Sequence, residues 1–437
     1  MTTTSSKNGI EKLQGLFTDL PRSALIKADT IRKGIRYTPN LLSIGRWAVP
    51  QVHYIFEWDH QDLHSKNDVV EGWVTVPGVF QLGDGTTTIL KLDNTSPYEI
   101  RSEGDARYRL YSDEEPIDEV YFEPRPEWFG KRTKDGTLMC KVVSSPGRNC
   151  ILALTLLGHC EYFNTGDQCA FCCLVPSTDK FRELGIEKAM RTKADQVLEV
   201  YEAIAAEHPV GHINLTGGGL RDTKKEAELY VKFLSEVMEG LGSDNKVPWL
   251  VITQALDEDS QRKIHEAGRG KVFLCHPIEA WNEKHFEVMA PGKAKYVGRK
   301  NWMDALVRAV GIFGRGRVLT NIVGGMEMAP PHGFKTYAEG MKSTLEYFEW
   351  CFQRDIVPSY LFWTSAPGSV YEEVPPPPTE YMLSATVEFL KLQKKYRMPF
   401  PRCICHKCRA VCVESDIMRL APEYRMLDDG TSLYSYC

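Results

Sequence analysis

Between about residue 150 and residue 375, short apolar runs alternate with longer segments in which apolar residues recur every three or four positions. The short runs are typical of buried strands and the longer segments of amphipathic helices. The predicted strands are 151–157, 211–215, 249–253, 272–275, 318–323 and 359–362, and the predicted helices are 194–206, 224–239, 258–267, 302–313 and 337–352. This alternation predicts an α/β fold, a partial (β/α)6 barrel of the TIM type, with its chemistry in the loops that follow the strands.

The regions before and after this alternating segment have different residue patterns. Residues 1–45 combine a polar tail with amphipathic helical segments such as 10–20, and the region 46–147 contains short aromatic and β-branched runs separated by turn-forming residues. Those runs, at 52–58, 72–82, 86–92, 108–111 and 119–122, predict a small β-rich domain. Four prolines at 375–378 end the predicted barrel region 148–375, because proline does not fit a helix interior. A helix at 380–395 then opens a C-terminal, cysteine-rich region, 376–437.

Composition and charge exclude several classes of protein. The chain has 437 residues, of which 43% are hydrophobic and 25% charged, and its net charge is −5. These values are ordinary for a globular protein, so a disordered or collagen-like chain is excluded. The near-balanced charge lacks the basic footprint of nucleic-acid binding. We expect a cytoplasmic protein that does not enter a membrane, since residues 1–8 lack the apolar core of a secretory signal and no apolar run reaches about 20 residues.

The 13 cysteines are concentrated in two clusters, at 160–173 and at 403–412. In a reducing compartment, clustered cysteines indicate metal or redox ligands more than disulfides. The first cluster directly follows the first predicted barrel strand, where an active-site loop belongs. Three thiolates from such a loop can hold three irons of a 4Fe–4S cluster and leave the fourth iron open to a small molecule.

The spacing within the first cluster is informative. Cys169 and Cys172 are separated by two residues, the second of which is the aromatic Phe171. This pattern resembles the radical S-adenosylmethionine (radical SAM) superfamily, whose usual motif is C-x3-C-x2-C with an aromatic residue before the last cysteine. Here residues 161–168 separate Cys160 from Cys169, so the first half is expanded. Cys173 is an alternative third ligand, but we favour Cys172 because Phe171 then takes the family position beside the adenine.

Further motifs follow the later strands in the order expected for that superfamily. Gly217, Gly218 and Gly219 come after the second strand, where glycines let the backbone approach a ligand closely. The resemblance implies that this segment contacts the methionine moiety of the cofactor. Glu279, which ends the fourth strand, and Arg299 resemble the biotin-synthase-like branch, in which such residues bind the cofactor's amino and carboxylate groups.

Two more segments resemble the same branch. Residues 321–327 resemble its fifth strand and the glycine-bearing end of that strand, which implies that Val323 and Met326 lie at the cofactor. Residues 367–369, Pro-Gly-Ser, resemble its Pro-Gly-Thr turn after the sixth strand. The resemblance covers roughly residues 148–395 and leaves the β-rich and C-terminal regions unexplained.

The second cluster has the spacing C-x-C-x2-C-x3-C, from Cys403, Cys405, Cys408 and Cys412. Four thiolates this close in sequence predict a bound metal. Structural zinc usually takes two separated C-x2-C pairs, so we favour an auxiliary iron–sulfur cluster, with zinc or a single iron as the alternatives.

The resemblance implies an enzyme that reductively cleaves S-adenosylmethionine on a 4Fe–4S cluster. The resulting 5′-deoxyadenosyl radical would take hydrogen from an unactivated carbon of an unknown small-molecule or peptide substrate, for methylation, sulfur insertion or rearrangement. A reducing partner such as flavodoxin or ferredoxin is implied, and cobalamin stays open as a further cofactor. The alternatives are an iron–sulfur carrier or scaffold and a zinc-binding protein, neither with radical chemistry.

Overall fold

The computed structural model describes residues 9–49, 69–70, 73–74, 76–143, 145, 151–183 and 192–434. Its larger sheet has six strands in the spatial order β13-β12-β11-β10-β9-β8. The strands are β8 (Ile151–Leu157), β9 (His212–Gly217), β10 (Trp249–Ile252), β11 (Val272–Cys275), β12 (Val318–Gly324) and β13 (Val357–Phe362). All neighbours pair in parallel, and each strand lies beside the previous one in the chain. The sheet is therefore an open, partial barrel, which confirms the predicted fold class.

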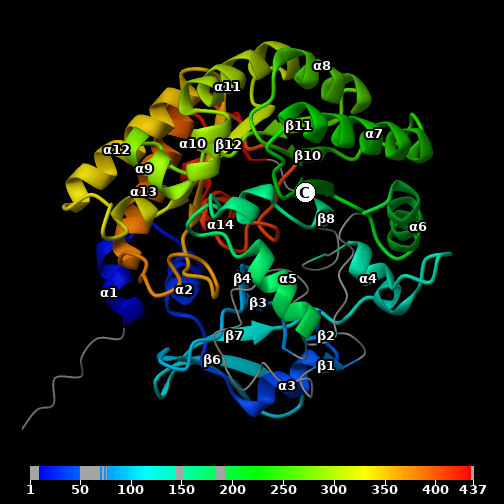
Figure 1. The fold of residues 1–437 in the computed structure, drawn as a ribbon. Coiled ribbons are helices and arrows are strands. Elements are labelled where there is room, and N and C mark those ends of the chain that lie inside the picture. The colour runs from blue at the N-terminus through cyan, green and yellow to red at the C-terminus, as the bar shows by residue number, and fades with distance from the viewer. Residues whose placement is uncertain are drawn as a thin grey trace, which may run out of the picture.

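The helices between these strands arch over one side of the sheet (Figure 1). The long ones are α6 (Ala194–Ala205), α7 (Thr223–Leu241), α8 (Glu258–Ala267), α11 (Arg299–Phe313) and α12 (Tyr337–Phe352), each close to its predicted bounds. Their starts include side-chain caps: the Asp222 side chain accepts the backbone N–H groups of Lys224 and Lys225 at the start of α7. The sequence prediction missed α5 (Leu174–Glu183), α9 (Glu283–Met289) and α10 (Pro291–Tyr296), all of which belong to strand–helix loops.

The N-terminal part contains a five-stranded antiparallel sheet in the order β4-β3-β7-β6-β5. Its strands are β3 (Val79–Leu82), β4 (Thr87–Ile89), β5 (Tyr98–Ser102), β6 (Tyr108–Ser112) and β7 (Glu115–Tyr121), and β1 (Val69–Val70) pairs with β2 (Trp73–Val74) separately. The β-rich character is as predicted, although β5 was not expected. The strand predicted at 52–58 lies outside the described residues.

Further helices come from the two ends of the chain. The early ones are α1 (Gly9–Leu16), α2 (Arg22–Lys33) and α3 (Pro39–Gly45), and the late ones are α13 (Thr379–Lys395), α14 (Glu414–Leu420) and α15 (Pro422–Arg425). Helix α2 packs against both α13 and β4. A single apolar core accordingly runs from the antiparallel sheet into the barrel. The domain boundaries drawn from the sequence stay a prediction.

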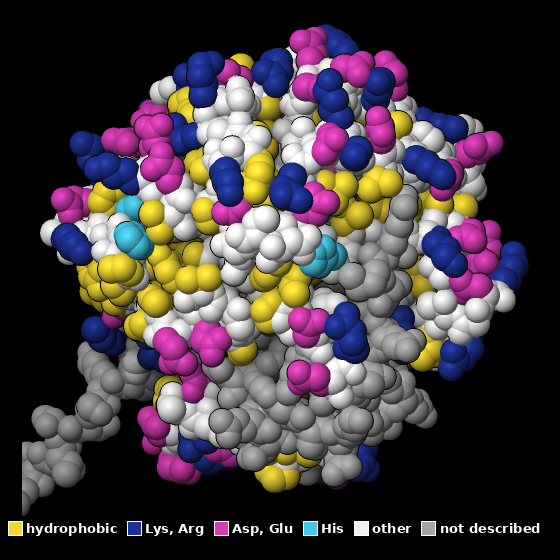
Figure 2. Space-filling model, in the orientation of Figure 1, with side chains coloured by type: hydrophobic (Ala, Val, Ile, Leu, Met, Phe, Trp, Pro, Cys, Tyr) yellow, Lys and Arg dark blue, Asp and Glu magenta, His cyan; other side chains and the backbone are white. Residues whose placement is uncertain are grey.

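The surface shows no large area of one charge on the face in Figure 2, where lysine and arginine side chains alternate with acidic ones over the barrel helices. Hydrophobic side chains gather across the middle of that face. Within the described ranges, no helix has both the length and the apolarity that a membrane crossing requires.

Candidate functional site

The three predicted cluster ligands lie in the loop between β8 and α5, at the carboxyl edge of the barrel sheet. Cys160 directly precedes the short helix η4 (Glu161–Thr165), and Cys172 N–H donates to the Cys169 carbonyl at 2.9 Å in a tight turn. Desolvation raises the pKa of the Cys172 thiol to about 12, and it raises the thiol pKa values of Cys160 and Cys169 as well. Thiols in such surroundings are neutral alone and need a positive metal group to become thiolates. The donor set therefore fits a 4Fe–4S cluster, which takes thiolates as ligands.

The expanded segment between Cys160 and Cys169 is well packed. The Tyr162 ring stacks on Tyr296 of α10, with centroids 5.5 Å apart and planes 7° from parallel. The Tyr162 hydroxyl donates to the side-chain oxygen Oε1 of Gln254. Gly292 N–H donates to the Asp167 carbonyl at 2.9 Å, and a Cβ on Gly292 would lie 2.5 Å from the Tyr162 ring. The long first loop is thus fixed on α10 and the end of β10, which positions the cysteines at its two ends.

The glycine segment at the end of β9 packs against the same loop. A Cβ on Gly218 would lie 2.0 Å from the His159 carbonyl oxygen, and one on Gly217 would lie 2.8 Å from the Leu157 nitrogen. A Cβ on Gly219 would lie 2.9 Å from the Gln254 side chain, while Glu161 N–H donates to the Gly219 carbonyl at 2.9 Å. The lack of a Cβ at these glycines thus lets the end of β9 pack closely on the loop that carries Cys160, and a contact with the cofactor stays a prediction.

Glu279, just beyond β11, forms a buried ion pair that the sequence did not reveal. Lys293 Nζ lies 2.6 Å from Glu279 Oε1 and also donates to the Pro277 carbonyl at 2.8 Å. Asn321 Nδ2 donates to Glu279 Oε2 at 3.3 Å. Glu279 itself adopts a left-handed backbone conformation with φ of 66°, which turns the chain sharply at the edge of the sheet.

Lys293 also lies near the cysteines. Burial disfavours the charged form of Lys293, but the negative charges of Glu279 and of the Cys169 and Cys160 sulfurs, when these are thiolates, outweigh that cost and raise the pKa of Lys293 above its usual value. The sequence analysis did not single out Lys293, because one lysine 14 residues after Glu279 carries no recognisable pattern. Its ammonium supplies positive charge between a carboxylate and the predicted cluster ligands.

Arg299 lies apart from this pair. Its Nε and Nη2 donate to the Trp281 carbonyl at 3.1 and 2.7 Å, and its guanidinium stacks over the Trp281 indole at 4.9 Å from the centroid. The structure therefore brings Glu279 together with Lys293 and not with Arg299. A role for Arg299 at the cofactor stays a prediction.

The remaining predicted cofactor contacts share an apolar cluster at the carboxyl edge. Phe171, Val323 and Met326 belong to it, together with Ala170, Ala280, Met289, Ala329, Trp363, Tyr371 and Val374. The Trp363 Nε1 and the Tyr371 hydroxyl are buried there without a hydrogen-bond partner among the described residues. Because buried polar atoms are normally bonded, these two groups are available to a ligand.

The second cysteine cluster is only partly brought together. Cys405 and Cys408 lie close to each other and to His212, the first residue of β9. Cys403 and Cys412 are buried but are not members of this group of neighbouring ligand atoms. His212 was missed from the sequence, because an isolated histidine at a strand start carries no metal-binding pattern.

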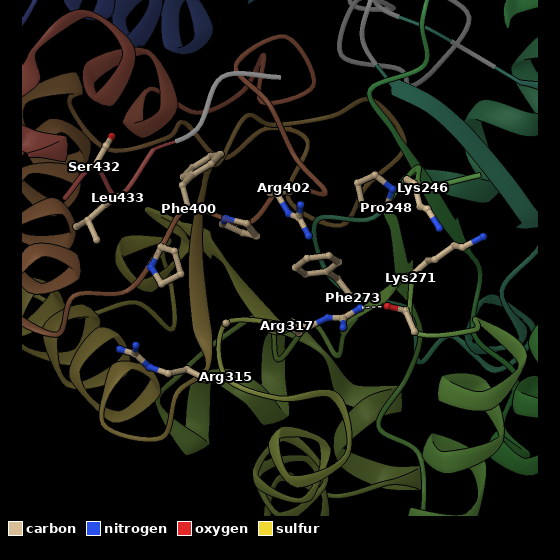
Figure 3. A pocket seen from close by; sticks show the side chains of 14 residues that line it. Lys246, Pro248, Lys271, Phe273, Arg315, Arg317, Phe400, Arg402, Ser432 and Leu433 are labelled. Carbon is tan, nitrogen blue, oxygen red and sulfur yellow. Dashed lines mark hydrogen bonds between the residues drawn. The ribbon is translucent and has the colours of Figure 1, made fainter. Parts of the chain in front are cut away.

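The opposite end of the barrel has a basic pocket of about 630 Å³ (Figure 3). It lies where β10, β11 and β12 begin, and Arg317 there donates to the carbonyls of Gly270 and Val272 at 2.6 and 3.0 Å. Its charged lining consists of Lys246, Lys271, Arg315, Arg317 and Arg402. Sequence reasoning did not find this pocket, because its residues come from loops far apart in the chain.

Comparison with known proteins gives distant similarities. No protein-family model matches the chain. A bacteriochlorophyllide c C-7(1)-hydroxylase from Chlorobaculum limnaeum is 24% identical over 256 residues, which are 56% of this chain and 60% of that protein. The chain thus matches less than two thirds of the hydroxylase.

Solved structures with similarity include methylornithine synthase (PylB), at a TM-score of 0.41 and 14% identity over 65% of this chain and 78% of that one. A radical SAM methyltransferase from Sphaerobacter thermophilus has a TM-score of 0.37 and 14% identity, covering 69% of this chain and 76% of the other. HydG, a maturase of the [FeFe]-hydrogenase, has a TM-score of 0.37 and 14% identity, and the match covers 63% of this chain and 52% of HydG. The name of the methyltransferase is that of the superfamily that the cysteine motif resembles.

Proposed function

We propose that the chain is a radical SAM enzyme that holds a 4Fe–4S cluster on Cys160, Cys169 and Cys172. The observation that carries this proposal is the position of those thiols at the carboxyl edge of a partial barrel, beside the buried Lys293–Glu279 pair. When bound, the cluster supplies the electron that cleaves S-adenosylmethionine reductively.

The residues of the chain bind and orient the cofactor in this proposal. The Glu279 carboxylate accepts hydrogen bonds from the cofactor's amino group. The backbone at Gly217–Gly219 lies beside the loop that carries Cys160. Phe171, Val323 and Met326 form an apolar wall that excludes water from the reacting carbon. Lys293 Nζ, at 2.6 Å from Glu279 Oε1, fixes the position of that carboxylate at the edge of the sheet.

The net reaction we propose is functionalisation of an unactivated carbon, by hydroxylation, methylation, sulfur insertion or rearrangement. The distant relative is, by its name, a hydroxylase of bacteriochlorophyllide c, which favours including hydroxylation in this set. A flavodoxin or ferredoxin is the kind of partner that would deliver the electron. The substrate-facing groups would include the unpartnered Trp363 Nε1 and Tyr371 hydroxyl, which lack hydrogen bonds within the described ranges.

Electron paramagnetic resonance of the anaerobically reconstituted, reduced protein tests the assignment. We expect the signal of a reduced 4Fe–4S cluster to change when S-adenosylmethionine is added, and the responsive signal to be absent from Cys172→Ala. A signal that the cofactor leaves unchanged would contradict the proposal and favour an iron–sulfur carrier. A protein that binds zinc and no iron would contradict both the radical SAM enzyme and the iron–sulfur carrier.

A further inference from the structure

His212 is a buried side chain without bonding partners. It begins β9 and is 0% exposed, and neither ring nitrogen has a hydrogen-bond partner in the part of the chain that the structure describes. Burying an imidazole with both nitrogens unbonded is costly, so native proteins nearly always satisfy such atoms. Neutral imidazole is also the commonest nitrogen ligand of protein-bound metals.

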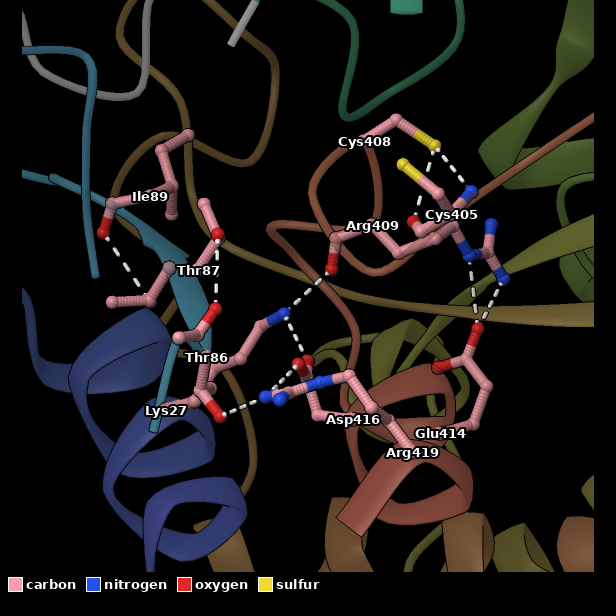
Figure 4. Close-up of polar contacts among 12 residues, drawn as sticks. Lys27, Thr86, Thr87, Ile89, Cys405, Cys408, Arg409, Glu414, Asp416 and Arg419 are labelled. Atoms are coloured by element: carbon pink, nitrogen blue, oxygen red, sulfur yellow. Dashed lines mark hydrogen bonds and ion pairs between the residues drawn. The ribbon is translucent and has the colours of Figure 1, made fainter. Parts of the chain in front are cut away.

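Two thiols lie beside this imidazole. The ligand atoms of His212, Cys405 and Cys408 all lie within 4.8 Å of one another. The Cys405 N–H donates to Cys408 Sγ at 3.1 Å, and Figure 4 shows the two sulfur atoms turned toward each other. The Cys408 thiol in turn donates to the Cys405 carbonyl at 3.2 Å.

The spacing distinguishes a single ion from a 4Fe–4S cluster. Around one tetrahedral ion with bonds of roughly 2.0–2.3 Å, neighbouring ligand atoms stand about 3.5–3.8 Å apart. The protein thiolates of a 4Fe–4S cluster stand farther apart, because each iron of that cluster takes one of them. The three ligand atoms, one from each of His212, Cys405 and Cys408, lie within 4.8 Å of one another, and this spacing therefore fits one shared ion. Two thiolates and an imidazole are ligands that zinc accepts.

We propose that His212, Cys405 and Cys408 bind one divalent metal ion of the zinc class, with a fourth position left for a small ligand. This ligand set differs from the one predicted from sequence, because His212 is a ligand and Cys403 and Cys412 are not. Two thiolates neutralise the divalent charge, so the occupied site carries no net charge in the protein interior. The ion joins the start of a barrel strand to a loop that is about two hundred residues away along the chain.

Buried ion pairs fix the loop that carries the two cysteines. Lys27 of α2 donates to the Arg409 carbonyl at 2.8 Å and to Asp416 at 2.7 Å, and both ionic side chains are 0% exposed (Figure 4). The Arg409 guanidinium pairs with Glu414 and donates to Ser359 Oγ on β13 at 3.0 Å. These contacts hold the loop against the barrel without help from a metal, so the site is preorganised for the ion.

The site is independent of the proposed radical chemistry. His212 begins its strand, whereas Cys160, Cys169 and Cys172 follow the end of theirs, so the two sites share no ligand. Loss of one metal group therefore does not require loss of the other. A failure of S-adenosylmethionine cleavage leaves this proposal standing, and a failure to bind the ion leaves the barrel cluster standing.

The test uses the full chain with Cys160, Cys169 and Cys172 all changed to alanine, which removes the barrel ligands. Zn²⁺ is added, excess ion is removed, and bound metal is measured; Co²⁺ in its place reports thiolate ligation by its absorption. We expect about one ion per chain. His212→Ala, His212→Gln, Cys405→Ser and Cys408→Ser should each lose at least tenfold in affinity, with the far-ultraviolet circular dichroism unchanged for the glutamine variant.

The matched controls are Cys403→Ser and Cys412→Ser, which should keep the ion. Three results overturn the proposal: loss of the ion from both controls, retention of it with unchanged affinity in both His212 variants, or binding of iron with sulfide at these cysteines. The first would support the set of four cysteines predicted from the sequence.

Discussion

Lys293 Nζ lies 2.6 Å from Glu279 Oε1, and the two side chains are only 10% and 11% exposed. Glu279 follows β11 and Lys293 lies in α10, so the pair joins a strand end to the helix that also supports the cysteine loop. Removing one partner of such a pair leaves a charge buried without compensation.

Lys293→Met should therefore lower the free energy of unfolding by about 3–5 kcal/mol. Much of this loss should be recovered in the double variant with Glu279→Gln, since the unpaired carboxylate is then gone. The matched control is Lys295→Met in the same helix, because the Lys295 side chain is 58% exposed and pairs with Asp167. That change should cost about 1 kcal/mol or less. Urea unfolding measures all three, and equal losses for the two lysines would refute a special role for Lys293.

Gly218→Ala should disturb the loop that carries Cys160, because the added Cβ would lie 2.0 Å from the His159 carbonyl oxygen. We expect reconstituted iron at the barrel site to fall well below the wild-type level. Gly311→Ala in α11 is the control, since a Cβ there would have no neighbouring side chain within 4 Å and a helical alanine is about 0.5–1 kcal/mol more favourable than glycine. Iron retained in full by Gly218→Ala would show that the loop tolerates the displacement.

The third cluster ligand can be identified by two neighbouring substitutions. Cys172→Ala should abolish the barrel cluster, whereas Cys173→Ala should retain it, because Cys173 is buried at the start of α5 among apolar residues. Iron and sulfide analysis after anaerobic reconstitution separates the two outcomes. The reverse pattern would transfer the ligand role to Cys173.

Acid should destabilise the fold through His276, which follows β11. Burial lowers the pKa of its imidazole to about 3, against about 6.5 for an unfolded histidine. Between these values the unfolded chain binds a proton that the folded chain does not, so stability falls as the pH falls from about 6.5. The slope from this residue reaches about 1.4 kcal/mol per pH unit.

His276→Gln should therefore show a shallower loss of stability than the wild type between about pH 6.5 and about pH 4.5, even if it is less stable near neutral pH. Thermal unfolding at several pH values measures the difference. If stability falls equally steeply with decreasing pH in both proteins, His276 does not contribute to the pH dependence of stability.

The barrel was predictable because buried parallel strands are short apolar runs, separated by helices whose apolar period is distinct. The place of the first cysteine segment after β8, and of the glycine segment at the end of β9, was predictable because each motif is local in sequence and directly follows an apolar run. Lys293 and His212 were not, because a single lysine or histidine gains meaning only when the fold brings it to a carboxylate or to two thiols. The short helices α9 and α10 were missed since they are too short to show a helical period.

In the proposed function, the thiols beside Lys293 and Glu279 support reductive cleavage of S-adenosylmethionine. Its most direct test is the formation of 5′-deoxyadenosine by the anaerobically reconstituted, reduced protein, followed by chromatography and mass spectrometry. We predict 5′-deoxyadenosine from the wild type and from Cys173→Ala, and none above background from Cys172→Ala. No 5′-deoxyadenosine from a wild-type protein with a full complement of iron and sulfide, or the same amount from Cys172→Ala, would contradict the account.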